Sequence, residues 1–517
     1  MSRQQRAILI TLLLGVFMGA LDIFIVAPAL DAIQGGLHVA PRVITWSFTA
    51  YTLVLVVTQP FVAKLSDRLG RRWVYVTCVI LFGVGSLLCA QATSFAPFIV
   101  GRGIQAVGAG GVLPVASAVI ADVFPEERRG MALGFVGSVF GLAFIIGPIV
   151  GSVLTSGIHL GTHLTDWHSI FYVNVPLVVI IVLLAARVLP TEAPGLRVGI
   201  PFDWNGAFLL ALALFCIIFG LTQLDFTSFA ANITNEAALP MLVLGLALLV
   251  PFWLNEQRAP DPLVDTRAFG RKQLIIAILL SIGAGIITSS IVYVPQLIEA
   301  TFGLAKGTGG FYLVWVSLTL TIGTPLTGRL LDSLGARQVM LIGSLVSSAA
   351  FGLLLVAGGS TFGLIVALLL IGYGLATYAG TPLRYIVINE APVQRRATSL
   401  AVLTVCNSLG QTIVLPLGGA LISSALIGVA HGSALATATR TADAIHGYYA
   451  IVLGILLVAA LLTTQLKSRT QELADRQVRQ RQVDHAVAQP SAHQKASVAL
   501  QTTAADVTSD YAAVSPR

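Results

Sequence analysis

Two ionisable residues, Asp22 and Arg102, lie inside runs of apolar residues that are long enough to cross a bilayer as helices. Counted inwards from the expected outer ends of these helices, near Leu30 and Phe95, each lies about seven residues, or ~10 Å, below the surface. The two side chains can therefore meet at one depth in the membrane. A charge at that depth costs at least ~2.5 kcal/mol by insertion scales, which favours a proton or substrate site. A purely structural ion pair is the alternative interpretation.

Four further polar residues in the apolar runs are candidates for lining a substrate cavity. Gln105 follows Arg102 by one helical turn, so it should share the same face and can hydrogen-bond the same group. Asn407 and Gln411 are spaced i and i+4 and should also face one direction. Tyr51 offers a stacking surface for flat organic molecules. Each has an ordinary alternative, because amides often bond across membrane helices and a tyrosine often packs in the core or anchors at the interface.

A short charged loop occurs twice, as AKLSDRLGRR at 63–72 and GRLLDSLGAR at 328–337. A tight, cationic turn between two membrane helices belongs on the cytoplasmic surface, where its acid can cap a neighbouring helix and its arginines can pair with other acids. Asp122 and Glu126 are the expected partners of the arginines. Such contacts predict an inner-gate latch that breaks when two halves rock, and simple membrane anchoring is the alternative. The residues assigned to this latch are Asp67, Arg68, Gly70, Arg71, Arg72, Asp332, Gly335 and Arg337.

Composition indicates a multi-pass membrane protein. Of 517 residues, 56% are hydrophobic and 10% are charged, with a mean hydropathy of +0.87, whereas soluble domains carry about 25% charged residues. The four cysteines fall inside apolar runs without a CxxC pair and are expected to be buried apolar side chains. The runs predict an all-α fold with fourteen spans that begin near Ala7, Val43, Trp73, Phe95, Met131, Ile170, Trp204, Ala238, Gln273, Gly309, Val339, Phe362, Thr398 and Tyr448.

The charge distribution predicts the orientation. The net charge is +7, and with both termini inside, nearly all lysines and arginines before the tail fall in loops and helix ends of one side, with Arg384 counted among them. Only Arg42, Lys306 and Arg440 fall on the other side. This asymmetry follows the positive-inside rule and predicts a cytoplasmic (inner) membrane protein with both termini in the cytoplasm. It argues against binding of nucleic acid, which needs a basic patch.

The spacing of the two loops predicts two six-helix halves, repeated in parallel, with two extra helices between them. The expected parts are a first bundle at 1–189, a linker and two inserted helices at 190–256, and a second bundle at 257–469. Residues 470–517 lack apolar runs and are rich in Gln, Ala, Ser and Thr, which predicts a mostly disordered cytoplasmic tail. The first part of this tail can extend the last helix as a polar stub.

One cluster has the residue types of metal ligands: His159, His163, Asp166 and His168, in the expected outer loop between the fifth and sixth spans. A solvated loop is favoured over a zinc site, because the loop is rich in Gly and Thr and no second cluster supports it. No G-x-x-x-x-G-K-[ST] sequence occurs, which argues against ATP as the energy source. We therefore expect neither a cofactor nor a bound metal.

The first charged loop resembles the G-x-x-x-D-R-x-G-R-R signature of the major facilitator superfamily, with Ala63 in place of the first Gly. The segment GRGIQAVGAGG at 101–111 resembles a second family motif, whose intramembrane Arg is implicated in proton transfer; that role falls on Arg102. The sequences GALD, WHSIFYVNVP and FDWNG resemble the 14-helix drug:proton antiporters of the EmrB/QacA type, and they lie at 19–22, 167–176 and 202–206.

The fifth span resembles the antiporter motif, which is associated with exporters and not with symporters. The matching residues are Gly134, Gly147, Pro148 and Gly151, with Ala143 and Ser152 where the motif has Gly. Small residues let helices approach closely, and Pro148 removes one backbone hydrogen bond, so a pliable and leak-tight helix interface is expected. Ordinary close packing is the alternative.

These features predict a proton-coupled secondary exporter, and not an enzyme, that works by alternating access between its two halves. Burial disfavours a charged Asp22 and a nearby Arg102 favours it, so small changes in spacing can load and release a proton. A cavity with one acid predicts neutral or monovalent cationic amphiphiles as substrates. The alternatives are a dedicated exporter of a lipid, siderophore, amino acid or self-made antibiotic and, more remotely, a non-transporting sensor. The expected partners are the substrate, protons and the lipid bilayer, and a periplasmic adaptor stays open.

Overall fold

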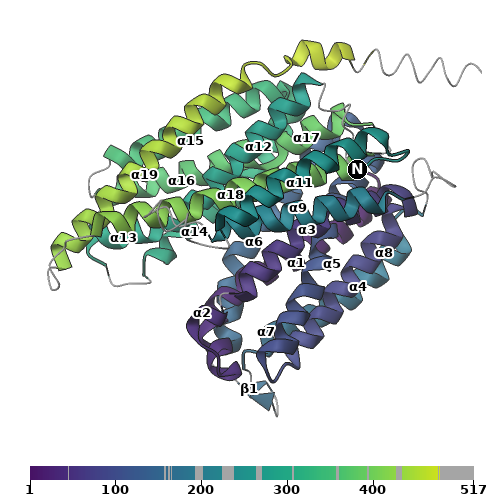
Figure 1. Ribbon diagram of the computed structural model, residues 1–517. Coiled ribbons are helices and arrows are strands. Elements are labelled where there is room, and N and C mark those ends of the chain that lie inside the picture. The colour runs from purple at the N-terminus through teal and green to yellow at the C-terminus, as the bar shows by residue number, and fades with distance from the viewer. Residues whose placement is uncertain are drawn as a thin grey trace, which may run out of the picture. The chain divides into compact units, whose positions relative to one another are not determined.

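The computed structural model describes residues 1–44, 46–155, 159–160, 163–164, 166–191, 202–223, 238–263, 271–304, 308–356, 360–392, 395–426, 434–475 and 477. These residues are almost entirely helical (Figure 1). The predicted linker at 190–203 and the tail at 470–517 fall largely outside the described residues.

The first part of the chain contains helices and one small β-ribbon. The elements are α1 (Arg3–Leu37), α2 (Pro41–Ile44), α3 (Trp46–Leu69), α4 (Arg71–Ala90), α5 (Phe95–Val123), α6 (Glu126–Thr155), β1 (His159–Leu160), β2 (His163–Leu164), α7 (Ser169–Tyr172) and α8 (Asn174–Val188). The strands pair antiparallel, with His159 opposite Leu164. They add a two-residue ribbon to the predicted all-α fold.

Two helices, α9 (Trp204–Thr222) and α11 (Ala238–Arg258), follow and pack against each other. The rest of the chain is shown in green to yellow in Figure 1. Its elements are α12 (Lys272–Ser290), η2 (Ile291–Tyr293), α13 (Val294–Phe302), η3 (Thr308–Tyr312), α14 (Leu313–Leu334), α15 (Ala336–Val356), α16 (Thr361–Leu375), the π-helical turn η4 (Ala376–Gly380), α17 (Thr381–Glu390), α18 (Arg396–Leu426) and α19 (Ala434–Thr463).

Local sequence explains several helix starts. Ser2 and Gln5 form a capping box at the start of α1, in which each side chain accepts from the backbone of the other. Asp203 caps α9 by accepting from the backbone of Gly206 at 2.8 Å, and Ser360 caps α16 in the same way. These side chains satisfy donors that the first helical turn leaves free.

Thirteen helices of the described residues are long and apolar enough to cross a membrane. Twelve of their starts match predicted spans to within a few residues, whereas the last begins at Ala438 and not near Tyr448. The polar residues at 439–447 hid this start, because the helix continues past its apolar run. The remaining predicted span corresponds to α18, a 31-residue helix.

The chain divides into two compact units, Met1–Leu466 and Lys467–Arg517. In the first unit, buried residues of α3, α9, α11 and α18 share one hydrophobic cluster, so the two extra helices pack where α3 meets α18. In the second unit, residues 469–475 are helical, and a short helical cap links Ser468 with Gln471. Residues 464–468 are not helical, so this stub does not continue α19 as predicted.

Candidate functional site

Asp22 of α1 and Arg102 of α5 meet inside the protein. Arg102 Nη1 donates to Asp22 Oδ2 at 2.7 Å, and both residues are 0% exposed. Gln105 joins them as expected from its place one turn along α5, since its Nε2 donates to Asp22 Oδ1 at 2.7 Å. Its Oε1 also accepts from Arg102 Nη1 at 2.6 Å. Asp22 is therefore held by Arg102 and by Gln105, and Arg102 also positions the Gln105 amide.

Two further residues complete this group, which we call the Asp22 cluster (Asp22, Ser86, Arg102, Gln105 and Asn174). Asn174, the first residue of α8, donates to Asp22 Oδ1 and to Ser86 Oγ, both at 3.3 Å. Ser86 of α4 also accepts from Gln105 Nε2 at 2.8 Å. Arg102, Gln105 and Asn174 all donate to the carboxylate, an arrangement that fits its ionised form.

Tyr51 of α3 covers the cluster from one side. The guanidinium carbon of Arg102 lies 4.0 Å from the centre of the Tyr51 ring, within the range of a cation–π contact. Tyr51 is 4% exposed, and neither its hydroxyl nor Arg102 Nε has a hydrogen-bond partner among the described residues. Tyr51 therefore touches the predicted proton site itself, and no substrate contact is needed to explain its position.

Close helix packing positions the cluster. A Cβ on Gly85 of α4 would overlap the backbone of α5 at Gly101 and Gln105. On the other side, α6 crosses α1 closely, because a Cβ on Gly147 would lie 2.6 Å from Phe24 Cβ and one on Gly151 would lie 2.8 Å from Pro28 Cγ. Glycine is required at both crossings, since any larger side chain would push the helices apart.

The predicted antiporter motif on α6 therefore has two packing partners. Gly147 and Gly151 lie against α1, near Asp22, whereas Gly134 lies against α14, with Thr324 O 2.7 Å from an ideal Cβ. Pro148 lies inside α6 between the two α1 contacts. One helix thus connects the surroundings of the proton site with the second half of the chain.

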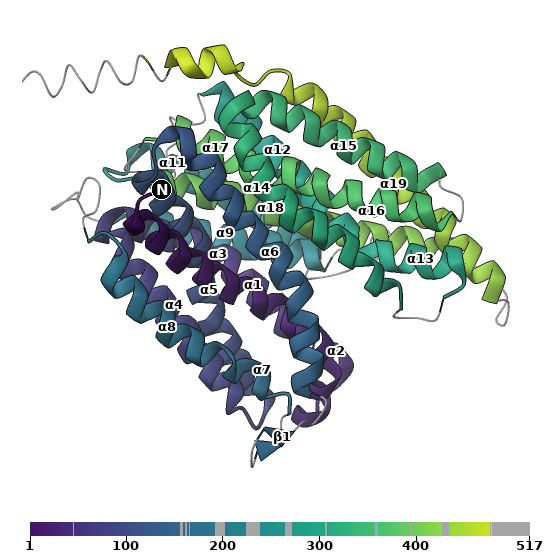
Figure 2. The same cartoon turned by 180° about the vertical axis from the view of Figure 1, so that it is seen from behind.

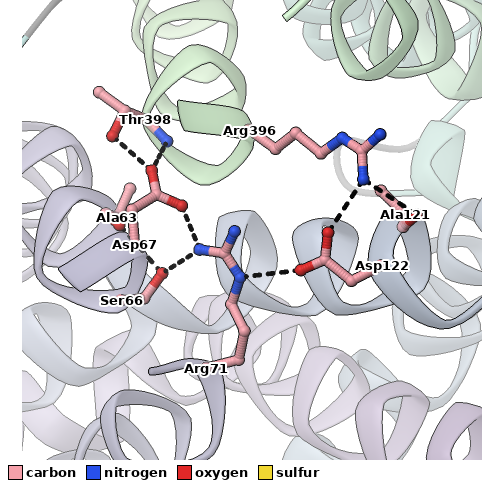
Figure 3. Close-up of polar contacts among 8 residues, drawn as sticks. All are labelled: Ala63, Ser66, Asp67, Arg71, Ala121, Asp122, Arg396 and Thr398. Carbon is pink, nitrogen blue, oxygen red and sulfur yellow. Dashed lines mark hydrogen bonds and ion pairs between the residues drawn. The ribbon is translucent and has the colours of Figure 1, made fainter. Parts of the chain in front are cut away.

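The first repeated loop holds together residues from four helices (Figure 3). Asp67 accepts from Arg71 and also from the backbone N–H and hydroxyl of Thr398, at 3.1 and 2.8 Å. Arg71 Nε donates to Asp122 Oδ2 at 3.2 Å, and Arg396 Nη1 donates to Asp122 Oδ1 at 3.0 Å. Asp67 therefore caps the amino end of α18. Arg396, which pairs with Asp122, lies in the first turn of the same helix.

The second loop mirrors the first. Asp332 accepts from the backbone N–H groups of Gly130 and Met131, each at 3.0 Å, near the amino end of α6. Gly70 and Gly335 both have positive φ, of 100° and 86°, which only glycine adopts readily. The repeat in sequence is thus a repeat in conformation and in contact: each loop acid binds the start of a long helix from the other part of the chain.

Three other cations of the first loop, Lys64 and the predicted latch residues Arg68 and Arg72, have different partners. Lys64 Nζ donates to Asp261 at 2.6 Å, and Arg68 lies 3.9 Å from the same acid and over the Phe202 ring. Arg72 donates to the carbonyl of Ala186 and to Thr191 Oγ1. Sequence reasoning missed Asp261, which lies after α11 and outside any motif.

Two other residues named with the latch are Glu126 and Arg337. Glu126 pairs at 3.4 Å with Arg129 on its own helix, although it was predicted to meet the loop arginines. Arg337 makes no ion pair with any residue that the structure describes. Of the two acids offered to the arginines, Asp122 meets Arg71 as expected.

Asn407 and Gln411 share one face of α18, as predicted. Gln411 Nε2 donates to Asn407 Oδ1 at 2.6 Å, and Asn407 Nδ2 donates to the carbonyl of Ser281 on α12 at 3.4 Å. Both side chains are partly exposed. The pair links α18 to α12, which is the ordinary role that the sequence left open beside cavity lining.

The outer-loop histidines give no metal site in the part of the chain that the structure describes. His168 Nδ1 lies 2.7 Å from Asp166 Oδ2, and its ring stacks on Trp167 at 3.7 Å between centroids. The side chains of His159 and His163 lie outside the described residues. The contacts of His168 are those of a loop packed onto the end of the helices.

Comparison with known proteins identifies relatives along most of the chain. The sequence profile described as "Major Facilitator Superfamily" matches residues 12–288 and 273–504. An uncharacterized MFS-type transporter of Bacillus subtilis, YfiU, is 30% identical over 405 residues, which are 77% of this chain and 76% of that protein. The multidrug transporter protein MdtP of the same organism is 29% identical over 75% of this chain and 70% of its own length. The tetracenomycin C resistance and export protein of Streptomyces glaucescens is 28% identical, with the same two coverages.

Solved structures share the fold. The proton:xylose symporter XylE matches 89% of this chain and 95% of its own with a TM-score of 0.64 and 15% identity. The human organic anion transporter MFSD10 matches 89% of this chain and 100% of its own with a TM-score of 0.62 and 18% identity. At these identities the likeness concerns the arrangement of helices alone.

Proposed function

The chain belongs to the major facilitator superfamily, and we propose that it is a proton-coupled exporter of small amphiphilic molecules. The Asp22 cluster is the observation that carries this proposal. A carboxylate at 0% exposure is paired with a guanidinium and receives two further amide donors within one membrane-spanning bundle. A buried ionisable pair of this kind is costly and is retained mainly where protons or substrates move.

Proton exchange at this site follows from its geometry. Moving α1 against α5 would take Arg102 and Gln105 away from Asp22, and a buried carboxylate that loses its cation takes up a proton. The reverse movement restores the pair and releases the proton. Gly147 and Gly151 of α6 touch α1 near Asp22, so movement of α6 can change these distances.

The repeated loops support an alternating-access mechanism. Both loop acids bind helices from the other part of the chain, so the face that carries the loops is closed in this structure. The positive-inside rule supports the proposal that this face is cytoplasmic and that both termini lie inside. Breaking these contacts would open the cytoplasmic side for substrate entry.

The free energy available from the entry of one proton is close to that needed to accumulate a solute outside the cell. Moving one charge through a potential of 100 mV yields ~2.3 kcal/mol, and a hundredfold accumulation of a neutral solute requires ~2.7 kcal/mol. The energetic argument applies to any small amphiphile. Two relatives are named for multidrug transport and for export of tetracenomycin C, so a pump dedicated to one natural product is the second candidate.

The test is transport by Asp22→Asn protein in proteoliposomes with an imposed proton gradient. This variant keeps the side-chain size and an acceptor for Arg102 but cannot ionise, so proton-driven dye transport should fall at least about a hundredfold while the protein still folds. Asp443→Asn is the matched control, because Asp443 is an exposed acid on α19. Proton-driven transport that persists in the Asp22 variant would exclude Asp22 from coupling.

A further inference from the structure

Arg384 is a cation inside a membrane-spanning segment. It lies in the first turn of α17, within the span Thr361–Glu390, and the helix continues past it to Glu390. The sequence counted it among the cations of loops and helix ends, and it lies six residues before the end of this 30-residue helical span. An arginine at such a position is costly unless something compensates its charge.

The protein does not compensate this charge within its described residues. Arg384 makes no hydrogen bond or ion pair there, and no acidic side chain lies near its guanidinium. Arg71, Arg102 and Arg396 each pair with an aspartate. Arg384 thus lacks the acidic partner that these three buried arginines have.

The exposed part of Arg384 faces the interior of the helix bundle. The seven residues Thr381, Pro382, Leu383, Tyr385, Ile386, Val387 and Ile388 are all buried. They point in every direction around the helix, and α17 packs against α6, α12, α14, α15 and α18. Figure 2 shows α17 beside α12 and α14. Arg384 nevertheless stays partly exposed. Lipid does not reach a helix that is covered on all sides, so the exposed part of Arg384 faces away from lipid.

The same face is open one turn earlier. Gly380 is partly exposed, and the nearest atoms to an ideal Cβ on it are Leu375 O at 3.6 Å and Thr324 Cγ2 at 3.7 Å. Thr324 also approaches Gly134 and Gly137 of α6. The open face of α17 therefore lies beside the contact between α6 and α14, where the two parts of the chain meet.

Two further features supply positive charge and a donor. Gly380 leaves the helical conformation, with φ −90° and ψ −118°, so α17 starts again at Thr381 and its amino end carries partial positive charge. The Thr381 hydroxyl is 0% exposed and has no partner among the described residues. A guanidinium and a hydroxyl, both without a partner among the described residues, thus lie within one turn of a helix start.

We propose that Arg384, Thr381 and the start of α17 bind an acidic group of the transported molecule. The substrates would then be amphiphiles with a carboxylate or an equivalent anion, a charge class opposite to the one that the sequence suggested. Asp22 does not compete for such a role, since its two oxygens already receive donors from Arg102, Gln105 and Asn174. This inference rests on the proposed export function and specifies its substrate.

The test compares a rhodamine dye that has a free carboxyl group with the ethyl ester of the same dye. Binding to the purified full-length protein in detergent is followed by fluorescence anisotropy, which requires neither a proton gradient nor coupling. The wild type should prefer the acid, and Arg384→Gln should weaken binding of the acid about tenfold or more while changing ester binding by less than about twofold. Arg384→Lys should retain part of the preference, and Arg329→Gln, at an exposed arginine of α14, is the matched control.

Thermal unfolding of the same variants provides the second measurement. Because no described partner is lost, Arg384→Gln should be at least as stable as the wild type. A large loss of stability would assign Arg384 a structural role and overturn the proposal. The proposal would also be overturned if the wild type bound the acid dye no better than the ester, or bound neither dye. The same holds if Arg384→Gln kept the wild-type affinity for the acid dye. Vesicle lipids with anionic headgroups that displace the acid dye would assign the site to lipid and overturn it as well. Failure of the Asp22→Asn transport test, by contrast, would affect the coupling role alone.

Discussion

The Asp22 cluster and the site at Arg384 handle a charge inside the membrane in opposite ways. Asp22 is fully buried, and both of its oxygens receive hydrogen bonds from residues of neighbouring helices. Arg384 is partly exposed and has no described partner. A charge that the protein compensates itself is suited to an ion that binds and leaves without a counter-ion, such as a proton. An uncompensated charge is suited to a ligand that brings the opposite charge.

The largest effect is expected when the compensated site loses its cation. Arg102→Gln leaves Asp22 buried without its positive partner, which should cost about 3–5 kcal/mol or force the acid to take up a proton. The measurement is the midpoint of thermal unfolding in detergent, beside Arg384→Gln as the comparison. Equal stability losses in the two variants would break the distinction between the sites.

The next effect concerns the two repeated loops. Asp67→Asn removes the charge that pairs with Arg71 and caps α18. We expect the free energy that favours the closed loop face to fall by about 1.5–3 kcal/mol. Asp332→Asn should cost less, because Asp332 is partly exposed whereas Asp67 is buried. Spin labels at the exposed positions Leu69 and Ser333 report the distance between the loops. A larger opening in the Asp332 variant would contradict the ranking.

A smaller effect is expected at Ser86. Ser86→Ala removes an acceptor from Gln105 and Asn174, and we expect a loss of about 1–2 kcal/mol in the free energy of unfolding. Ser344 is the matched control, since it is also 0% exposed but donates only to Met340 O of its own helix. Ser344→Ala should therefore change stability less. A reversed order would mean that the cluster adds little to the fold.

The smallest effect is expected at the amide pair of α18. Asn407 is partly exposed, and its bond to Ser281 O is long at 3.4 Å. Asn407→Ala should cost less than about 1 kcal/mol, and Asn174→Ala should cost more because Asn174 is 1% exposed and bonds Asp22. Unfolding of both variants in detergent checks the order. If the Asn407 variant binds dye as the wild type does, the amide pair is a helix contact only.

Much of the fold was predictable because apolar runs of helical length have few alternatives in a membrane. The span starts at Phe95, Trp204 and Ala238 coincide with the structure. The start at Tyr448 was wrong, since the helix extends into polar sequence. The pairing of Asp22 with Arg102 followed from depth alone. Ser86 and Asn174 were missed, although a search for every polar residue in the spans would have listed both.

The sequence by itself determined which residues enter the membrane, at what depth, and that a charged loop occurs twice, because these properties depend on local composition and spacing. Only the tertiary structure decided which side chains meet. Asp67 binds α18, Asp261 binds Lys64, and Arg384 is left without an acid, although all of these residues are charged and lie near helix ends or inside spans. The difference arises because partners are set by the rotation and crossing of helices far apart in the chain, which a linear pattern does not contain.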